Sequence, residues 1–468
     1  NTLLQPPSST HMSRIVRQSK YRHIYGQEAK KENSYTELRT NISAWDSNFV
    51  ACSKEFFAIP WAGGGGSLAV IKYADIGRKT AETPVLTGHS AQILDFAFNP
   101  FNDYLVATGS ADCTVKIWQI PEEGLEKSQT ESLLTLQDHT KKVGNVVFHP
   151  TASNVLLTAG MDHKINYWDL ETGKIHHTVK DIFGDAIQSL AFNKDGSQLA
   201  VTSKDKKVRL IDPRLSETVI AEADGHQGTK GSRVAWLSGI DKLLTVGFTK
   251  IAARQYMIWD PRNMATPIKT EDIDMSAGLI MPFYDHDTSV LYLAGKGDGN
   301  IRYYEVVDDD TLMHFVGEYK STAPQRGMGM VPKTILNVVP DCEVTRLLKL
   351  ENTSVTPISF TVPRKSELFQ EDIFPDTFAP EATQTAEEYF NGGNAEPKLV
   401  SMKPGENNFR KGAAAFVPKV EQKAPKTELP KKVSNPKELL EQNEALRKRV
   451  EALEQENWEL KQKLGQQE

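Results

Sequence analysis

Short runs of alternating or β-branched hydrophobic residues recur along residues 46–362 and indicate β-strands. Examples are ILDFAF (93–98), VGNVVF (143–148), VRLID (208–212) and SVLYLAG (289–295). Segments rich in glycine or aspartate separate such runs, as at GGGGS (63–67), and they favour turns. Short strands with turn signals at this spacing predict an all-β fold that is built from repeats.

Aspartate–tryptophan pairs mark the repeat. Asp112 precedes Trp118 by six residues, and fifty residues later Asp162 precedes Trp168 by six. The dipeptides Gly-His at 88–89 and Asp-His at 138–139 are also fifty residues apart. Weaker copies include the pairs Asp205–Ile211 and Asp298–Tyr304 and the segment 226–260, which has His226 and Trp259 without an aspartate at that offset. A period of this size predicts a repeat architecture.

The pattern resembles WD repeats, which have four strands in each blade of a β-propeller. The resemblance implies a buried polar network in each blade. An aspartate in the turn before the third strand accepts from a histidine, and a hydroxyl on the second strand accepts from the indole N–H. The corresponding residues here are His89, Thr108, Asp112 and Trp118 in one blade, and His139, Thr158, Asp162 and Trp168 in the next. We interpret all eight as structural, not as catalytic groups or metal ligands.

Seven blades are predicted, at 46–73, 89–120, 139–170, 182–212, 226–260, 276–306 and 312–362. A closed ring leaves no open sheet edge. We therefore expect an N-terminal strand around residues 13–26 to complete the last blade. The predicted fold is an all-β seven-bladed WD-repeat propeller with a C-terminal extension, a flexible linker and an α-helical coiled coil.

The hydrophobic pattern changes twice in the C-terminal part. Residues 396–436 contain six prolines and many lysines, which predicts a basic linker that spans about 35 Å as a flexible coil. Residues 437–468 then show a heptad pattern, which predicts a coiled coil. Its d positions are Leu439, Leu446, Leu453 and Leu460, and its a positions are Asn443, Val450, Asn457 and Leu464.

Different residues of this coiled coil favour different numbers of helices. Asn443 and Asn457 at a positions favour a dimer. Arg449, Val450, Leu453 and Glu454 match the trimer-favouring pattern Arg-apolar-x-x-apolar-Glu. In that pattern the arginine covers the core and pairs with a neighbouring glutamate. We favour a homotrimer, with a dimer as the alternative.

The composition of the chain narrows the class of protein. The chain has 468 residues, 39% hydrophobic and 25% charged, which is typical of soluble proteins. Residues 398–436 carry nine basic and three acidic residues, and residues 437–468 carry six and eight; the total of −6 therefore leaves −10 for residues 1–397. An acidic body of this kind disfavours a nucleic-acid-binding protein. No apolar run has the length of a membrane span, and we expect residues 1–12, up to Met12, to be a cloning remnant with an initiator methionine.

Nothing in the sequence suggests enzymatic chemistry. The GGGGS segment lacks the Lys-Ser/Thr of a phosphate loop. The acidic triplet 308–310 lacks the spacing of a calcium loop. Cys52, Cys113 and Cys342 are too far apart to indicate a disulfide framework or a zinc site, which fits a reducing cytosol. We expect no enzyme, no metal and no cofactor.

Five stretches carry a closer resemblance: SKYRHIYG (19–26), AWDSNFVA (44–51), LAGKGDGNIRYYE (293–305), TAPQRGM (322–328) and VPRKSELFQEDIFPDT (362–377). With the propeller, linker and coil, they make the chain similar to the coronins from Ser13 to its end. The resemblance implies a propeller at 13–362 and an extension at 363–395 that packs along one propeller face. The linker at 396–436 and the coil at 437–468 follow.

The resemblance also implies a cytoplasmic protein of the actin cytoskeleton and cell cortex that binds filamentous actin. It implies action with the branch-nucleating actin-related protein complex and with cofilin. In coronins a basic residue shortly before the WDS stretch contributes to filament binding, and Arg39 holds that position here. Lys30 and Lys31 are candidate helpers, as are Lys20 and Arg22 unless they serve the closing strand. The alternative function is a scaffold for vesicle-trafficking or signalling complexes, with actin binding incidental.

Overall fold

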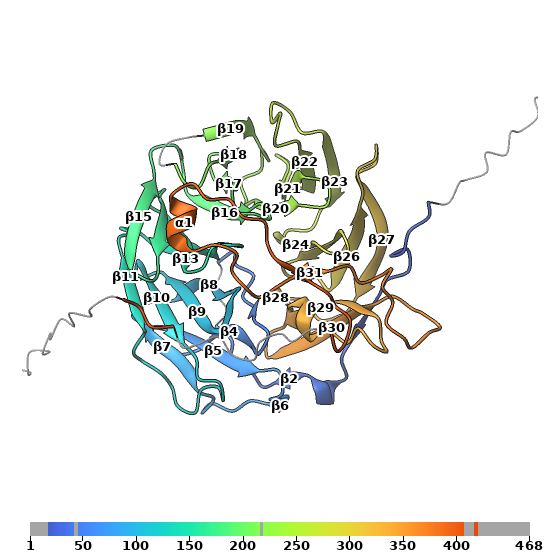
Figure 1. The fold of residues 1–468 in the computed structure, drawn as a ribbon, viewed down its shortest axis with the longest axis horizontal. Coiled ribbons are helices and arrows are strands. Elements are labelled where there is room, and N and C mark those ends of the chain that lie inside the picture. Colours follow the sequence, from blue (N-terminus) through green and yellow to red (C-terminus); the bar gives the residue numbers. More distant parts are fainter. Residues whose placement is uncertain (1–16, 42–44, 216–218, 407–415, 420–468) are drawn as a thin grey trace, which may run out of the picture. The chain divides into compact units, whose positions relative to one another are not determined.

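The computed structural model describes residues 17–41, 45–215, 219–406 and 416–419. Its strands form seven sheets around a common axis, one sheet to each blade (Figure 1). Six blades are antiparallel meanders whose four strands follow in chain order from the axis outward. The predicted all-β seven-bladed propeller is therefore confirmed.

The strands of these six blades have the following bounds. The first blade has β3 (Ala51–Cys52), β4 (Phe56–Trp61), β5 (Gly66–Lys72) and β7 (Val85–His89), and the second has β8 (Ile93–Asn99), β9 (Asn102–Ser110), β10 (Thr114–Gln119) and β11 (Leu134–Gln137). The third has β12 (Val143–Phe148), β13 (Val155–Gly160), β14 (Ile165–Asp169) and β15 (Lys174–Val179), and the fourth has β16 (Ile187–Phe192), β17 (Leu199–Ser203), β18 (Lys207–Ile211) and β19 (Val219–Asp224). The fifth has β20 (Arg233–Leu237), β21 (Lys242–Phe248), β22 (Arg254–Trp259) and β23 (Lys269–Asp274), and the sixth has β24 (Ile280–Asp285), β25 (Val290–Gly295), β26 (Asn300–Val306) and β27 (Met313–Lys320).

The seventh blade joins the two ends of the ring. It contains β28 (Gly327–Met330), β29 (Glu343–Leu350) and β30 (Ser354–Thr361), and β1 (Tyr25–Glu28) pairs with β30 as the outer strand. A second short strand, β2 (Tyr35–Thr36), pairs with the other end of β30 and in parallel with β6 (Gly77–Arg78). The closing strand expected near residues 13–26 thus lies at the end of that segment. The predicted blade ranges were too short, because the outer strands β7, β11, β15, β19 and β23 lie beyond the ends of the ranges predicted for their blades. One strand was also placed in the wrong blade: β27, which we placed in the seventh, pairs with β26 and completes the sixth.

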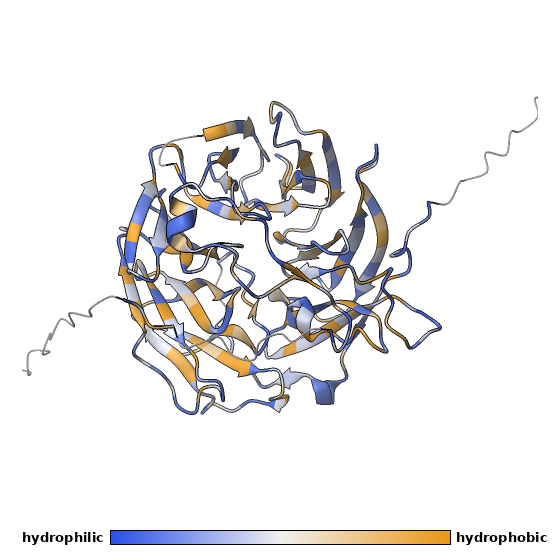
Figure 2. Cartoon of the chain, in the orientation of Figure 1, coloured by the Kyte–Doolittle hydropathy of each residue, from blue (hydrophilic) through white to orange (hydrophobic). Residues whose placement is uncertain are grey.

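The hydrophobic core lies between neighbouring blades, and this explains the sequence pattern. The middle strands β4 and β13 are buried on both faces and read as continuous hydrophobic runs. The outer strand β11 alternates buried and exposed residues, and the outer strand β23 has no buried residue. Figure 2 shows hydrophobic residues concentrated on the blade strands. A strand covered on both faces is apolar at nearly every position, whereas an edge strand alternates.

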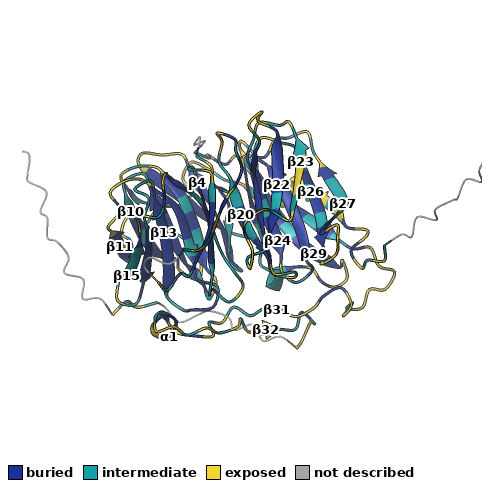
Figure 3. Ribbon diagram, turned by 90° about the horizontal axis from the view of Figure 1, so that it is seen from above, coloured by how far each residue is buried: buried dark blue, intermediate teal, exposed yellow. Residues whose placement is uncertain are grey.

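After β30 the chain crosses the face that carries the turns between first and second strands (Figure 3). β31 (Thr377–Phe378) pairs with β32 (Leu399–Val400), and α1 (Ala386–Phe390) starts with a capping box at Thr385. Tyr389 of α1 is fully buried and packs against His149 with ring centroids 4.0 Å apart. Because β32 and buried Met402 belong to this extension, it continues past the predicted boundary at residue 395.

The docking of α1 should weaken in acid, because it rests on uncharged imidazoles. Burial lowers the pKa of His149 to about 3, and burial with the neighbouring His176 lowers the pKa of His177 to about 4. An unfolded histidine has a pKa of about 6.5, so the unfolded chain binds protons first as the pH falls. The histidine contribution to stability is then complete above about pH 6.5 and is lost progressively as the pH falls toward about 4.

The measurement is the free energy of unfolding in urea as a function of pH. We expect a decrease of up to about 1.4 kcal/mol per pH unit for each imidazole. In His149→Phe, which keeps an aromatic ring but cannot titrate, the slope should be smaller. His23→Phe, at an exposed histidine, is the matched control and should keep the wild-type slope. Equal slopes in wild type and His149→Phe would contradict this account of the docking.

Candidate functional site

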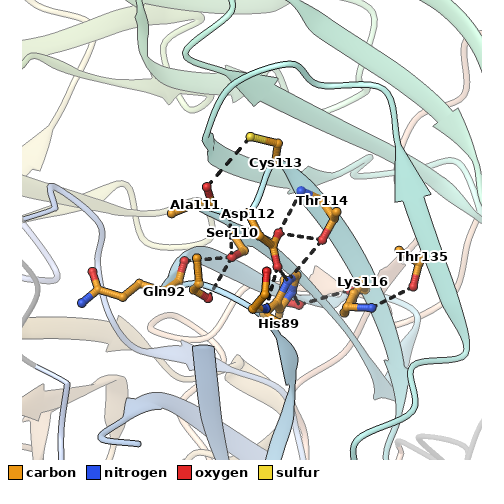
Figure 4. A network of polar contacts seen from close by, with 12 residues as sticks. His89, Gln92, Ser110, Ala111, Asp112, Cys113, Thr114, Lys116 and Thr135 are labelled. Carbon is orange, nitrogen blue, oxygen red and sulfur yellow. Dashed lines mark hydrogen bonds and ion pairs between the residues drawn. The ribbon is translucent and has the colours of Figure 1, made fainter. Parts of the chain in front are cut away.

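A closed polar network joins the first and second blades, because His89 ends β7 of the first blade and its partners belong to the second (Figure 4). His89 Nδ1 lies 2.8 Å from Asp112 Oδ2, and its Nε2 lies 2.8 Å from Thr108 Oγ1. Trp118 Nε1 donates to the same Thr108 oxygen at 2.9 Å. Burial raises the pKa of Asp112, but hydrogen bonds from His89 and Thr114 outweigh burial and hold that pKa below its usual range. A neutral imidazole satisfies both contacts, since Nδ1–H donates to the carboxylate and Nε2 accepts the hydroxyl proton.

The third blade repeats this geometry. His139 Nδ1 lies 3.0 Å from Asp162 Oδ1, and its Nε2 lies 2.9 Å from Thr158 Oγ1. Trp168 Nε1 donates to Thr158 at 2.9 Å. Burial raises the pKa of Asp162, but hydrogen bonds from His139 and Thr140 lower it overall to about 2. The polar groups of both networks form hydrogen bonds with one another and fix the turns between strands. Neither network therefore contains a free nucleophile or base.

The fifth blade builds the same network from other residues, which the sequence analysis missed. His226 Nδ1 lies 3.1 Å from Gln255 Oε1, and its Nε2 lies 3.0 Å from Thr245 Oγ1. Trp259 Nε1 donates to Thr245 at 2.9 Å. A search for aspartate at one offset overlooks Gln255. The pair His226 and Trp259 was the signal that the network exists.

In the fourth and sixth blades, the aspartate of the repeat pairs with an arginine instead of a histidine. Arg209 Nη2 lies 2.7 Å from Asp205 Oδ2 in the fourth blade. Arg254, on β22 of the fifth blade, has Nη1 2.7 Å from Asp298 Oδ2 of the sixth and two bonds of 2.6 Å to Asp274. The weak copies of the aspartate pattern at Asp205 and Asp298 are therefore ion pairs with arginine, not histidine networks.

No cluster of three histidine, cysteine or acidic residues suited to a metal ion occurs among the residues that the structure describes. None of the described helices is long and apolar enough to cross a membrane. The remaining candidates for a functional site are the exposed charged side chains.

Arg39 lies where the first and seventh blades meet, on the face opposite the extension. Its backbone oxygen accepts from Ala62 N at 2.7 Å beside the β4–β5 turn, and Thr40 Oγ1 donates to Asn352 O at 2.8 Å in the β29–β30 turn. The Arg39 side chain is exposed and forms no hydrogen bond or ion pair with any described residue. Arg326, which sequence reasoning did not select, is exposed nearby and binds Asn352 Oδ1 at 2.8 Å.

The other candidate lysines and arginines are not gathered around Arg39. Lys30 and Lys31 are exposed at the outer edge of the seventh blade, at the start of the 3-10 helix η1 (Lys31–Asn33). Lys20 and Arg22 line a groove with Glu371 of the extension. The structure thus separates Lys20 and Arg22 from Arg39, while Lys30 and Lys31 lie between the two sets along the chain. The ten predicted oligomerisation residues, from Leu439 to Leu464, lie outside the described residues.

Comparisons with known proteins agree with this architecture. Profiles for a WD domain, G-beta repeat, match residues 81–119, 130–169 and 175–212, and a type of WD40 repeat matches residues 355–397. A domain of unknown function (DUF1899) matches residues 14–78. Coronin-A of Dictyostelium discoideum is 48% identical over 449 residues, which is 95% of this chain and 97% of that protein. The chain belongs to the coronin family.

Further coronins show the same relationship. The coronin-like protein crn1 of Schizosaccharomyces pombe is 42% identical across 92% of this chain and 73% of its own, and human Coronin-2A is 42% identical across 84% and 76%. The crystal structure of the WD40 domain of Toxoplasma gondii coronin superimposes with a TM-score of 0.77 at 32% identity, over 82% of this coronin and 98% of that chain. The family assignment made from five short stretches is confirmed.

Proposed function

We propose that this coronin binds actin filaments through its propeller, at the junction of the first and seventh blades, and organises them as an oligomer. The observation that carries the proposal is Arg39. It is an exposed cation without a partner among the described residues, at the position that the family uses for filament contact. The function is binding rather than catalysis, because the described polar networks are used within the blades.

Charge supports a local contact rather than general attraction. Actin filaments are acidic, and residues 1–397 of this coronin carry −10. Attraction must therefore come from a patch in which positive side chains exceed negative ones. Arg39 and Arg326 supply two such charges beside the β29–β30 turn, and Lys30 and Lys31 are proposed as a second, separate contact at the outer edge of the seventh blade.

The proposal places the protein in the cytoplasm, at the actin cytoskeleton and cell cortex. Self-association through residues 437–468, as a trimer or a dimer, would bring several propellers to one filament or to neighbouring filaments. The branch-nucleating actin-related protein complex and cofilin are proposed as further partners on the family relationship alone.

Reversing the charge of Arg39 should weaken filament binding by tenfold or more and leave the fold intact. The change Arg39→Glu removes one attraction and adds one repulsion toward an acidic surface. Exposed substitutions shift stability by about 0.5 kcal/mol or less. Co-sedimentation with actin filaments measures the affinity, and thermal unfolding measures stability.

Lys174→Glu is the matched control for this variant. Lys174 is an exposed lysine on β15, the outer strand of the third blade, and its reversal changes net charge equally. We expect it to bind filaments almost as the wild type does. Equal binding by Arg39→Glu and wild type, or equal losses in the two variants, would refute a contact at Arg39.

A further inference from the structure

A basic pocket opens on the face opposite the extension, among turns of the third to sixth blades. Its volume is about 500 Å³, which lies in the range of ligand sites. Four cations line it, Lys204, Lys230, Arg233 and Lys296, together with the rings of Trp45 and Phe248. Arg39 and Arg326 do not line this pocket, so it is distinct from the proposed filament contact.

The four cations are not neutralised by ion pairs with described carboxylates. Lys230 Nζ donates to Ala277 O at 2.6 Å, and Arg233 and Lys296 donate to the backbone oxygens of Asp46 and Trp45. These acceptors are neutral carbonyl groups. By contrast, Lys207 and Arg209 on nearby β18 both pair with Glu222. One carboxylate, Asp46, also lines the pocket, so four positive charges stand against one negative charge. Such an excess of positive charge attracts an anionic ligand.

Arg233 adds a donor that the protein does not satisfy. It lines both this pocket and a cavity of about 390 Å³ along the inner strands. Its Nε is buried and has no hydrogen-bond partner among the described residues. Burial lowers the pKa of Arg233, and the negative charges of Asp95 and Asp46 oppose this effect. Arg233 lines the pocket, and carboxylates match guanidinium geometry, so this side chain suits a carboxylate ligand.

The pocket also contains a fixed aromatic surface. A side chain at Gly144 would bring its Cβ within 2.5 Å of Trp45 Cζ2, so a glycine is needed for the Trp45 ring to lie there. Lys230 Nζ stands 4.8 Å from the centre of the Phe248 ring, and Lys296 Nζ stands 4.3 Å from that of Phe49. Aromatic faces hold the ammonium groups in place without neutralising them.

We propose that this pocket binds a short acidic peptide segment of a partner protein, with carboxylates on the basic side chains and one apolar side chain against Trp45. The cations come from different turns, with Lys204 between β17 and β18 and Lys296 between β25 and β26. Cations on different turns beside aromatic residues fit carboxylates spaced along a chain better than one compact phosphate group. The proposal does not depend on filament binding, since its residues are different and its test contains no actin.

The test uses the full chain and a fluorescent peptide of alternating glutamate and leucine, with binding followed by fluorescence anisotropy. We expect saturable binding that weakens as salt rises. The same peptide with glutamine at every glutamate position should bind at least tenfold more weakly. Lys204→Glu, at an exposed pocket lysine with no side-chain partner among the described residues, should weaken binding about tenfold or more.

Lys250→Glu separates the pocket from general charge. Lys250 is an exposed lysine in the β21–β22 turn of the same face and does not line the pocket. Its reversal should leave peptide binding within about twofold, as expected for a charge outside the interface. Equal losses of peptide binding in Lys204→Glu and Lys250→Glu would overturn the proposal. Full peptide binding by Lys204→Glu would also overturn it, because the peptide would then bind elsewhere, as on the basic linker 396–436. Complete displacement of the peptide by inorganic phosphate at low concentration would assign a phosphate site instead.

Discussion

Deletion of residues 437–468 is expected to leave a folded propeller that binds filaments roughly 100-fold more weakly and no longer cross-links them. The seven blades close through the pairing of β1 with β30, and both strands lie before residue 362. Joining several propellers makes the second and third binding events intramolecular, and avidity gains of 100-fold or more follow when the linkers can span the sites. Linkers of about 35 Å allow this reach.

Sedimentation equilibrium and low-speed filament pelleting measure this effect. We expect an oligomer for the full chain, a monomer for the deletion and loss of pelleted filament bundles with the deletion. Trp458→Ala, at the outward b position of the predicted heptads, is the matched control and should leave the oligomer unchanged. A monomeric full chain at micromolar concentration would contradict the coiled coil.

The same experiment distinguishes three strands from two. A neutral residue at Arg449 should shift a trimer toward dimers while the helix persists, since Val450 and Leu453 remain in the core. A wild-type dimer would show that Asn443 and Asn457 outweigh the pairing of Arg449 with Glu454.

Replacement of Arg254 by methionine is expected to destabilise the propeller by about 3–5 kcal/mol, as removal of one partner from a buried ion pair does. The Arg254 side chain is 2% exposed and joins Asp274 to Asp298 across the fifth and sixth blades. Its loss leaves both carboxylates short of a partner: Asp274 keeps Arg302, and Asp298 keeps Ser276. Burial raises the pKa of Asp274, but the arginines outweigh it and hold that pKa far below its usual range, so this carboxylate stays ionised.

Chemical denaturation measures the change in the free energy of unfolding. Arg262→Met is the matched control, because Arg262 also pairs with an aspartate of the fifth blade but its side chain is 75% exposed. Exposed ion pairs contribute up to about 1 kcal/mol. A loss below about 1 kcal/mol for Arg254→Met would contradict a structural role for this bridge.

The sequence predicts the second and third blades in detail because each uses the full set of histidine, hydroxyl, aspartate and tryptophan at regular offsets. Pairs such as His89 with Asp112 could be named once the resemblance to WD repeats was recognised. The same function in the fifth blade is carried by Gln255, and between the fifth and sixth blades by Arg254. Different side chains can form the hydrogen bonds that the same buried turn needs. A search for fixed residue types therefore misses some of these side chains.

Boundaries were harder to predict for a related reason. β27 has no marker residue and joins the sixth blade only through its pairing with β26. β32 lies within a segment whose prolines and lysines indicate a linker, yet it pairs with β31. Both strands are recognised by the strands that they pair with, because their own residues give weak or misleading signals.

The proposed filament contact shows the same limit. Arg39 was selected from its place before the WDS stretch, but its neighbour Arg326 lies almost three hundred residues away in the chain. Only closure of the ring brings Thr40 and Arg326 to the same Asn352. A surface patch assembled from both ends of a propeller cannot be read from local sequence.

The central claim is that this coronin binds actin filaments, and co-sedimentation of the full chain with filaments tests it most directly. At micromolar actin and moderate salt, the account predicts that the protein enters the pellet and saturates as its concentration rises. Recovery of the protein only in the supernatant under these conditions would contradict the account and favour a scaffold for other complexes.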